Sequence, residues 1–423
     1  MAFEIASVRA QEILDSRSRP TLSVRVALAG GAVGVAGVPS GASTGTREAV
    51  ELRDGDLARY GGAGVTRAVD NVNGEIADAL TGSGVDGLAA VDRLLIDLDG
   101  TDTKGRLGAN AIVGVSMAAA RAMAAARGVP LYRFLAPEGV GARLPVPCFN
   151  VINGGRHAAN RLQPQEFMVC PLGAPSFAEA LRAGAEVYAA LRSRLQGAGL
   201  AVGLGDEGGF APELATPEEA LDVLVAAIAD AGYTPGRGGV AIALDPAASE
   251  FRGPDGRYTL VAGEGALTSA ELVERWSELL GRYPIWSLED GLGEDDTDGW
   301  ALLTERLGSK VQLVGDDNLV TNPAIIAEAI ERGIANAALI KLNQIGTVTE
   351  TLEAMRLCRN AGYGQMVSHR SGETTDTFIA DLTVSSGCGQ LKSGAPARGE
   401  RVAKYNRLVE IEAELDAAPY GLP

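Results

Sequence analysis

Six ionisable positions in the second half of the sequence could build an active site. Each closes a short apolar run, and nearly continuous apolar runs of this kind are typical of strands buried on both faces. In a (β/α) barrel the carboxyl ends of the strands meet on one face, so their side chains would converge. For any single position, the alternative is a charge that ends a strand in a solvated loop. The positions, 23 to 44 residues apart, are Asp245, Glu289, Asp316, Lys341, His369 with Arg370, and Lys392.

Three of these positions are carboxylates from three successive predicted strands. Asp245, Glu289 and Asp316 would offer oxygen ligands only, with no cysteine or histidine beside them in the sequence. Such hard ligands suit Mg²⁺. Without a metal ion, three converging carboxylates would repel one another, and at least one would have to stay protonated. The alternative is that nearby arginine or lysine side chains neutralise them.

Lys341, in LIKLNQIGT, is the candidate general base. A nearby divalent cation disfavours the ammonium form of a lysine, so a neutral amine able to accept a proton becomes available. Across the predicted barrel mouth, Glu207 lies in the glycine-rich segment GDEGG, where a ligand could approach the backbone closely. Glu207 is the candidate acid, and Glu166 in QEF is the second candidate. The alternative for GDEGG is an ordinary acidic turn.

The segment HRSGET could bind an anion. It places Arg370 and the hydroxyl of Ser371 directly after His369 and ahead of a predicted helix, and a helix N-terminus beside an arginine favours phosphate or carboxylate. Lys392 in QLKSG supplies another cation, and His157, one of two histidines, is a further functional candidate in a loop. The alternative for Arg370 is a salt bridge to the acidic surface.

Together these residues would supply a base, an acid, a divalent metal ion and an anion clamp. Removal of a proton α to a carboxylate produces an enolate-like dianion, and a metal ion on the carboxylate would neutralise the developing charge. Loss of a β-hydroxyl, assisted by an acid such as Glu207, would complete a dehydration. The predicted chemistry is therefore that of a carbon–oxygen lyase.

The elements that must hold these side chains fall into two parts, with a predicted boundary near residue 137. Residues 1–137 begin with strand-like runs at 22–28 and 33–38, continue through the loop PSGASTG and end in helical segments. Residues 138–423 repeat a strand-then-helix pattern, which predicts a barrel with its ionisable groups on one face.

Composition excludes several classes of protein. The chain has 54 acidic and 37 basic side chains, a net charge of −17, which argues against binding to nucleic acid or to an anionic membrane. Four cysteines without a CxxC pair indicate a reduced intracellular chain. No signal peptide is visible, and the apolar stretch at 111–126 is interpreted as a buried helix. We expect a cytoplasmic protein without nucleic-acid or membrane partners.

The chain resembles the enolase family through motifs that occur in order from about residue 5 to residue 415. The resemblance implies an α/β fold, in which a small α+β N-terminal domain with a mobile loop (1–137) caps an enolase-type (β/α)8 barrel (138–423) with an irregular start. It implies a homodimer or higher homo-oligomer and Mg²⁺-dependent dehydration of 2-phosphoglycerate to phosphoenolpyruvate, a step of glycolysis. The motifs include PSGASTG, QEFM, GDEGGFAP, SLED, VGDD, LIKLNQIGT, SHRSGET and GAPARGERVAKYN.

The resemblance also implies a role for each candidate residue. Lys341 would take the C2 proton of the substrate, and Glu207, assisted by Glu166, would help the C3 hydroxyl leave. Two Mg²⁺ ions are expected per site, with Ser43 of the mobile loop a ligand of the second. The first Mg²⁺ would be held by Asp245, Glu289 and Asp316, and the phosphate by Arg370 and Ser371. The rest of the substrate would be contacted by Gln165, Lys392 and His369, and His157 would close over the site.

Departures from the family pattern leave alternatives open. Ser18 and Arg19 replace a usual Gly-Asn pair, which puts the packing of the first hairpin in doubt, and the predicted lid contains Arg161 and Pro164. Arg161 would suit an additional carboxylate, as in a paralogue that dehydrates 2-phosphonoformylglycerate to carboxyphosphonoenolpyruvate. A second alternative is a non-catalytic scaffold or surface-binding role, although such a protein would be free to lose the candidate catalytic residues, and it has kept them.

Overall fold

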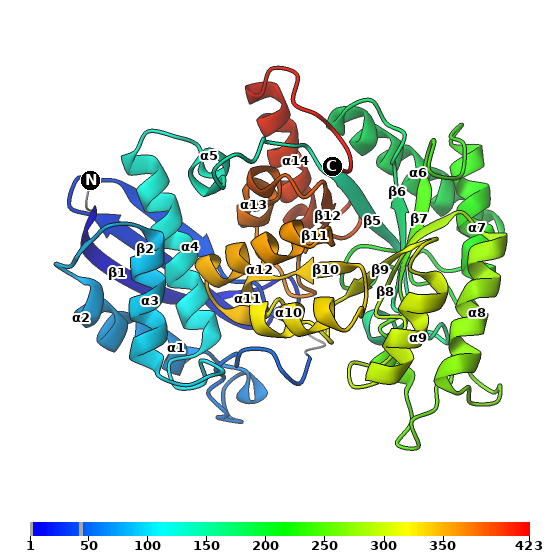
Figure 1. Cartoon of the computed structure of the whole chain (residues 1–423), viewed down its shortest axis with the longest axis horizontal. Coiled ribbons are helices and arrows are strands. Elements are labelled where there is room, and N and C mark those ends of the chain that lie inside the picture. Colours follow the sequence, from blue (N-terminus) through cyan, green and yellow to red (C-terminus); the bar gives the residue numbers. More distant parts are fainter. Residues whose placement is uncertain (1–2, 42–44) are drawn as a thin grey trace.

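The computed structural model of the chain describes residues 3–41 and 45–423. Its N-terminal part, blue to cyan in Figure 1, is built on an antiparallel sheet in the order β3-β2-β1-β4. Along β2, buried positions alternate with more exposed ones, as expected of a strand with one face on the core. The strands are β1 (Phe3–Leu14), β2 (Pro20–Leu28), β3 (Val33–Gly37) and β4 (Gly84–Val85).

Helix α4 (Ala109–Ala126) packs against this sheet. A Cβ at Gly114 would lie 2.6 Å from a methyl group of Val24, so glycine is what permits the close approach. Among the described residues, α4 is the one helix with the length and apolar composition to cross a membrane, but 83% of it is buried inside the protein. The other helices here are η1 (Tyr60–Gly62), α1 (Thr66–Asn71), the π-helical η2 (Val72–Ile76), α2 (Ala77–Leu80), α3 (Leu88–Asp99) and α5 (Leu131–Leu135).

The second part contains a closed eight-stranded barrel in the order β10-β11-β12-β5-β6-β7-β8-β9. Strand β6 is antiparallel to both of its neighbours, and the other adjacent strands are parallel, which gives the barrel an irregular start. The barrel fold predicted from the spacing of the strand ends is confirmed. The strands are β5 (Val146–Asn153), β6 (Glu166–Cys170), β7 (Ala241–Asp245), β8 (Ile285–Glu289), β9 (Gln312–Gly315), β10 (Ala337–Ile340), β11 (Gly364–Ser368) and β12 (Gln390–Lys392).

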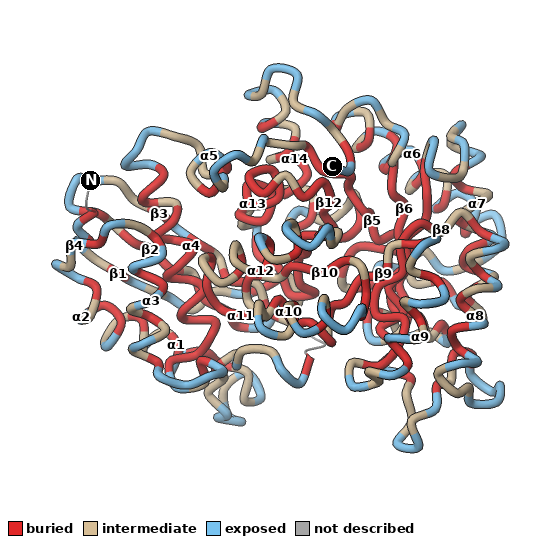
Figure 2. Tube along the Cα trace, viewed as in Figure 1, coloured by how far each residue is buried: buried red, intermediate tan, exposed pale blue. Residues whose placement is uncertain are grey.

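Helices surround the barrel, and Figure 2 shows buried strands enclosed by helices that are exposed along their outer faces. The predicted boundary near residue 137 lies in the segment between α5 and β5 and stays a prediction. The helices are η3 (Gly155–His157), α6 (Phe177–Gly197), α7 (Pro217–Asp230), η4 (Ala248–Phe251), α8 (Ser269–Arg282), α9 (Thr297–Leu307), α10 (Pro323–Glu331), α11 (Leu342–Ile345), α12 (Val348–Asn360), α13 (Phe378–Ser386) and α14 (Gly399–Glu414).

The two parts meet where α3 approaches the N-terminus of α12. The buried carboxylate of Asp92 accepts a hydrogen bond of 2.9 Å from the backbone N–H of Thr349, in the first turn of α12. Nearby, Lys104 Nζ lies 2.9 Å from Glu350 Oε1. These contacts fix the N-terminal part against the barrel, so that its loops can reach the barrel mouth.

Asp92 makes the stability of this junction depend on pH. Burial raises its pKa from 3.8 to about 6, although the hydrogen bonds with Ser116 and Thr349 act to lower it. Because the folded protein holds this proton more tightly than the unfolded chain, stability falls as the pH rises from about 4 to about 6, by roughly 3 kcal/mol. Asp92→Asn cannot ionise, so its melting temperature relative to wild type should increase between about pH 4.5 and pH 7.5. A difference that does not vary with pH would contradict this account.

Candidate active site

A cavity at the carboxyl ends of the barrel strands brings together most of the residues predicted from the sequence. Glu289 does not line it but contacts Lys392, which does, and Ser43 falls outside the described residues. Four lining residues were not predicted: Ala247, Asp290, Asp317 and Ser368. The predicted residues that line the cavity are His157, Gln165, Glu166, Glu207, Asp245, Asp316, Lys341, His369, Arg370, Ser371 and Lys392.

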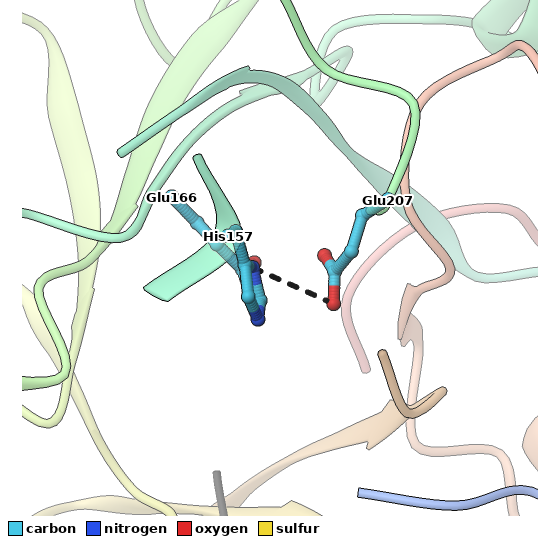
Figure 3. A group of neighbouring side chains, drawn as sticks. All are labelled: His157, Glu166 and Glu207. Atoms are coloured by element: carbon cyan, nitrogen blue, oxygen red, sulfur yellow. Dashed lines mark ion pairs between the residues drawn. The ribbon is translucent and has the colours of Figure 1, made fainter. Parts of the chain in front are cut away.

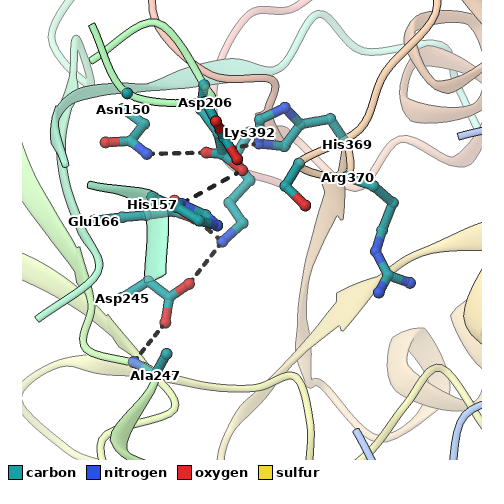
Figure 4. A network of polar contacts seen from close by, with 12 residues as sticks. Asn150, His157, Glu166, Asp206, Asp245, Ala247, His369, Arg370 and Lys392 are labelled. Carbon is teal, nitrogen blue, oxygen red and sulfur yellow. Dashed lines mark hydrogen bonds and ion pairs between the residues drawn. The ribbon is translucent and has the colours of Figure 1, made fainter. Parts of the chain in front are cut away.

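Lys392 lies at the centre of a group of buried carboxylates (Figure 4). Its Nζ is 2.7 Å from Glu289 Oε1, 3.1 Å from Asp245 Oδ2 and 3.4 Å from Glu166 Oε2. Burial alone would lower the pKa of Lys392, but these carboxylates raise it well above its usual range. The sequence left open that arginine or lysine side chains neutralise the carboxylates. Lys392 does so only in part, because its one ammonium group faces three carboxylates.

Lys341 forms a second ion pair in the cavity. Its Nζ is 2.5 Å from Asp316 Oδ2, while Gln344 donates to Asp316 Oδ1 at 2.8 Å. Burial would lower the pKa of Lys341, but the Asp316 charge raises it. A neutral Lys341 was expected only beside a divalent cation, and it stays a prediction, because neutrality requires that Asp316 be engaged by another cation.

A second acidic group, which the sequence analysis missed, adjoins Asp316. The carboxylates of Asp290, Asp316 and Asp317 have oxygens within 4.8 Å of one another. Asp290 accepts hydrogen bonds from the backbone N–H groups of Asp316 and Asp317 at 2.9 and 3.0 Å. Burial, followed by the neighbouring acids, raises the pKa of Asp317 to about 8. The signal was present in the doubled acids of SLED and VGDD, whose second members also line the cavity.

The charges of the site fit a divalent cation. Carboxylates outnumber the basic side chains of Lys341, Lys392 and Arg370, and Glu289 Oε2 is buried without a hydrogen-bond partner. Burial and neighbouring acids also raise the pKa of Glu289 well above its usual range, the behaviour expected of crowded carboxylates without a metal ion. Because the donors are carboxylate oxygens, Mg²⁺ is the metal ion that they suit.

Glu207 and Glu166 lie close together beside His157 (Figure 3). Glu166 begins β6, which is opposite β10 in the barrel and hence across from Lys341. His157 Nδ1 lies 3.8 Å from Glu207 Oε1 and 3.7 Å from Glu166 Oε1. Burial would raise the pKa of Glu207, yet the His369 and His157 rings and Arg401 hold it well below its usual range. Burial and the charge of Glu207 raise the pKa of Glu166 well above its usual range. Of the two carboxyl groups, Glu166 is therefore the one that holds a proton more readily.

The anion-binding end of the cavity is completed by the N-terminal part. Glu48 forms a bidentate pair with Arg370, with distances of 2.9 and 3.2 Å, so the partner of this arginine is buried and is not on the surface. Arg17, in the turn between β1 and β2, donates to Ser371 Oγ at 3.1 Å. Neither Glu48 nor Arg17 was predicted. An incoming phosphate would compete with Glu48 for Arg370.

The departures in the first hairpin leave its turn intact. Asp15 Oδ1 accepts hydrogen bonds from the backbone N–H groups of Arg17 and Arg19, at 2.8 and 2.9 Å. Ser18 adopts a positive φ of 59°, a conformation that a non-glycine residue rarely takes. The doubt about the packing of this hairpin is therefore removed, because Asp15 closes the turn.

Arg161 lies outside the cavity, contrary to the role considered for it. Its side chain is 65% exposed, and its Nε is 2.8 Å from Glu213 Oε1. It is not among the residues that line the cavity. An exposed glutamate therefore holds this arginine, and the reason to expect an additional carboxylate on the substrate is removed.

Comparisons with known proteins agree along the whole chain. The family model described as "Enolase, N-terminal domain" matches residues 5–135, and the one described as "Enolase, C-terminal TIM barrel domain" matches residues 141–421. A protein named "Enolase" from Rubrobacter xylanophilus is 59% identical over 419 residues. That match covers 99% of this chain and 96% of the relative.

Proposed function

The chain belongs to the enolase family, and from that premise we propose how its residues dehydrate 2-phosphoglycerate to phosphoenolpyruvate. The protein is a hydro-lyase of this family. One observation carries the residue assignment: Lys341, whose side chain is 11% exposed, and two neighbouring buried carboxylates, Glu166 and Glu207, line one cavity, with Lys341 and Glu166 on opposite sides of the barrel. A base and an acid on opposite sides of a substrate are what removal of a proton and loss of a hydroxyl require.

Lys341 is the proposed base that takes the proton from C2. It follows β10 directly, and its largely enclosed side chain is held by the ion pair with Asp316. For the amine to accept a proton it must first lose its own, so the attraction of Asp316 has to weaken when the site is loaded. Asp316 thus links the charge state of Lys341 to occupancy of the metal site.

Glu207 and Glu166 are proposed to help the C3 hydroxyl leave. A departing hydroxide needs a proton, and the raised pKa of Glu166 keeps one available within the pair. Asn150 donates to Glu207 Oε2 at 2.9 Å and holds this carboxylate in place. The pair therefore supplies both the proton and an ionised group that can redistribute it.

Enzymes of this family use Mg²⁺, and we propose two ions at this site. Asp245, Glu289 and Asp316 would hold the first, and Ser43 the second. When bound, the metal supplies charge neutralisation for the carboxylate of the reacting dianion. The unpartnered oxygen of Glu289 and the excess of carboxylates support this assignment.

The remaining polar residues are proposed to bind the substrate anion. Arg370 and Ser371 would hold the phosphate, while Lys392, Gln165 and His369 contact the rest, and His157 closes over the site. A chain of net charge −17 repels a polyanion on average. The buried cations at the barrel mouth overcome that field locally, where low dielectric strengthens their attraction.

The experiment that tests this function is conversion of 2-phosphoglycerate by the purified protein with saturating Mg²⁺. Phosphoenolpyruvate should form at a rate typical of enzymes, and a chelator should abolish it. Absence of turnover with metal bound would contradict the proposal and favour a scaffold role. We also propose that the protein acts in the cytoplasm as a homodimer or higher homo-oligomer, without nucleic-acid or membrane partners.

The first metal site can be tested without activity. Asp316→Ala removes one proposed ligand and leaves Lys341 without its counter-ion, so Mg²⁺ affinity should fall by about 10-fold or more. Titration calorimetry measures the change, with the exposed Asp295→Ala as control, because Asp295 pairs with Arg252 outside the cavity. Unchanged affinity in the Asp316 variant would exclude Asp316 as a ligand.

Arg161 gives a test of substrate choice. Because its guanidinium is exposed and paired with Glu213, Arg161→Ala should leave kcat/KM for 2-phosphoglycerate within about 2-fold of wild type. The same small effect is expected with 2-phosphonoformylglycerate, whatever its basal rate. A large selective loss on the phosphonate substrate would show that Arg161 reaches the substrate, and would revive the paralogue interpretation.

A further inference from the structure

Arg401, on α14, is completely buried behind the active site and has no role in the function proposed above. Its Nη1 lies 2.6 Å from both His369 Nδ1 and the carbonyl oxygen of Arg370. Its Nη2 donates to the carbonyl oxygens of Ser371 at 2.6 Å and of Asp206 at 3.2 Å. One guanidinium thus joins the two segments that carry the proposed acid and the proposed phosphate site.

The contact with His369 decides which ring nitrogen carries the proton. A guanidinium can only donate hydrogen bonds, so a ring nitrogen facing it at 2.6 Å must present its lone pair. The proton of a neutral His369 is then on Nε2. That nitrogen lies 3.2 Å from Glu207 Oε2, a short approach without the alignment of an ideal hydrogen bond, as is common before substrate binds.

We propose that Arg401 is a positioning residue, which fixes His369 as the neutral Nε2–H tautomer and directs that N–H at Glu207. Burial, opposed by the charge of Glu207 and reinforced by that of Arg401, lowers the pKa of His369 to about 3. The opposite tautomer would turn an unprotonated Nε2 towards Glu207, and that nitrogen could take a proton from the acid pair and become charged. Arg401 therefore keeps that proton within the acid pair. The inference rests on the role proposed for Glu207.

Lys404 provides a matched control on the same helix. It is also a buried cation, and its Nζ contacts Glu373 Oε2 and the carbonyl oxygen of Thr374, each at 2.7 Å. It holds the same loop as Arg401, but its hydrogen bonds go to Glu373, Thr374 and Glu400 and not to His369. If substitution of Arg401 and substitution of Lys404 both alter the state of His369, the cause is altered packing of the loop. If only substitution of Arg401 alters it, the cause is the loss of control over the tautomer.

The test is ¹⁵N NMR of protein labelled at histidine, which is simple because the chain has two histidines. His157→Asn identifies the His369 signals. In wild type at neutral pH, His369 should show a protonated Nε2 and an unprotonated Nδ1. Arg401→Met should lose this pattern and shift towards the doubly protonated ring, Arg401→Lys should restore it, and Lys404→Met should keep it. An Nδ1–H signal in wild type, or an unchanged pattern in Arg401→Met, would overturn the proposal.

A kinetic cycle separates action through His369 from general damage. Arg401→Met should lower kcat by about 10- to 100-fold, and Arg401→Lys should recover part of that loss. In a His369→Asn background, Arg401→Met should add little, because residues that act through one another are not additive. Equal losses in both backgrounds would overturn the inference. If wild type fails to turn over 2-phosphoglycerate, the proposed function fails, while the NMR result still decides the tautomer.

Discussion

Lys341→Ala should abolish formation of phosphoenolpyruvate and also abolish exchange of the C2 hydrogen of 2-phosphoglycerate with solvent deuterium. Both losses follow from one cause, because the variant lacks the amine that removes the C2 proton. General-base catalysis contributes about 10²- to 10⁴-fold, so a loss of at least that size is expected in kcat. Absorbance of the product measures turnover, and proton NMR of the recovered substrate in D₂O measures exchange.

Two controls accompany this experiment. Lys310→Ala removes an exposed lysine just before β9 and should leave both rates unchanged. The Lys341→Ala protein should bind Mg²⁺ at least as tightly as wild type, since Asp316 is then free of its ammonium partner. Retention of C2 exchange at the wild-type rate would show that another group is the base.

The barrel and half of its site were predictable because six strands obey one rule. A strand buried on both faces is a continuous apolar run, and a charge at its carboxyl end marks the catalytic face. Strand β6 escapes this rule because it runs antiparallel, so Glu166 reaches the same face from the first residue of its strand. Strand β1 was missed because half-exposed positions interrupt its apolar pattern.

The residues that complete the site depend on contacts between distant segments. Glu48 and Arg17 enter through docking of the N-terminal part on the barrel, about 320 and 350 residues away from their partners Arg370 and Ser371. The period of a strand or helix carries no information about such docking. The sequence likewise places Arg161 near the site, but it does not show where the side chain points. That direction is determined by the ion pair with the exposed Glu213.

Glu207→Gln should separate the two steps that Lys341→Ala removes together. The amide keeps an oxygen for the hydrogen bond from Asn150 and for the N–H of His369, but it cannot exchange a proton with Glu166. Loss of the C3 hydroxyl should therefore slow by about 10²- to 10⁴-fold. Exchange at C2 should continue, because Lys341 lies across the cavity and the substitution leaves both Lys341 and its partner Asp316 in place.

The ratio of exchange to turnover is the decisive quantity, because it does not depend on the fraction of active protein. In Glu207→Gln it should rise by about the factor that kcat falls, whereas general damage to the site would lower both rates and leave it unchanged. Glu166→Gln provides the matched comparison, since it removes the other member of the pair. If both variants raise the ratio, the two carboxylates act as one proton-sharing unit. If C2 exchange falls in step with turnover in Glu207→Gln, Glu207 belongs to proton removal at C2 and the assignment of base and acid must change.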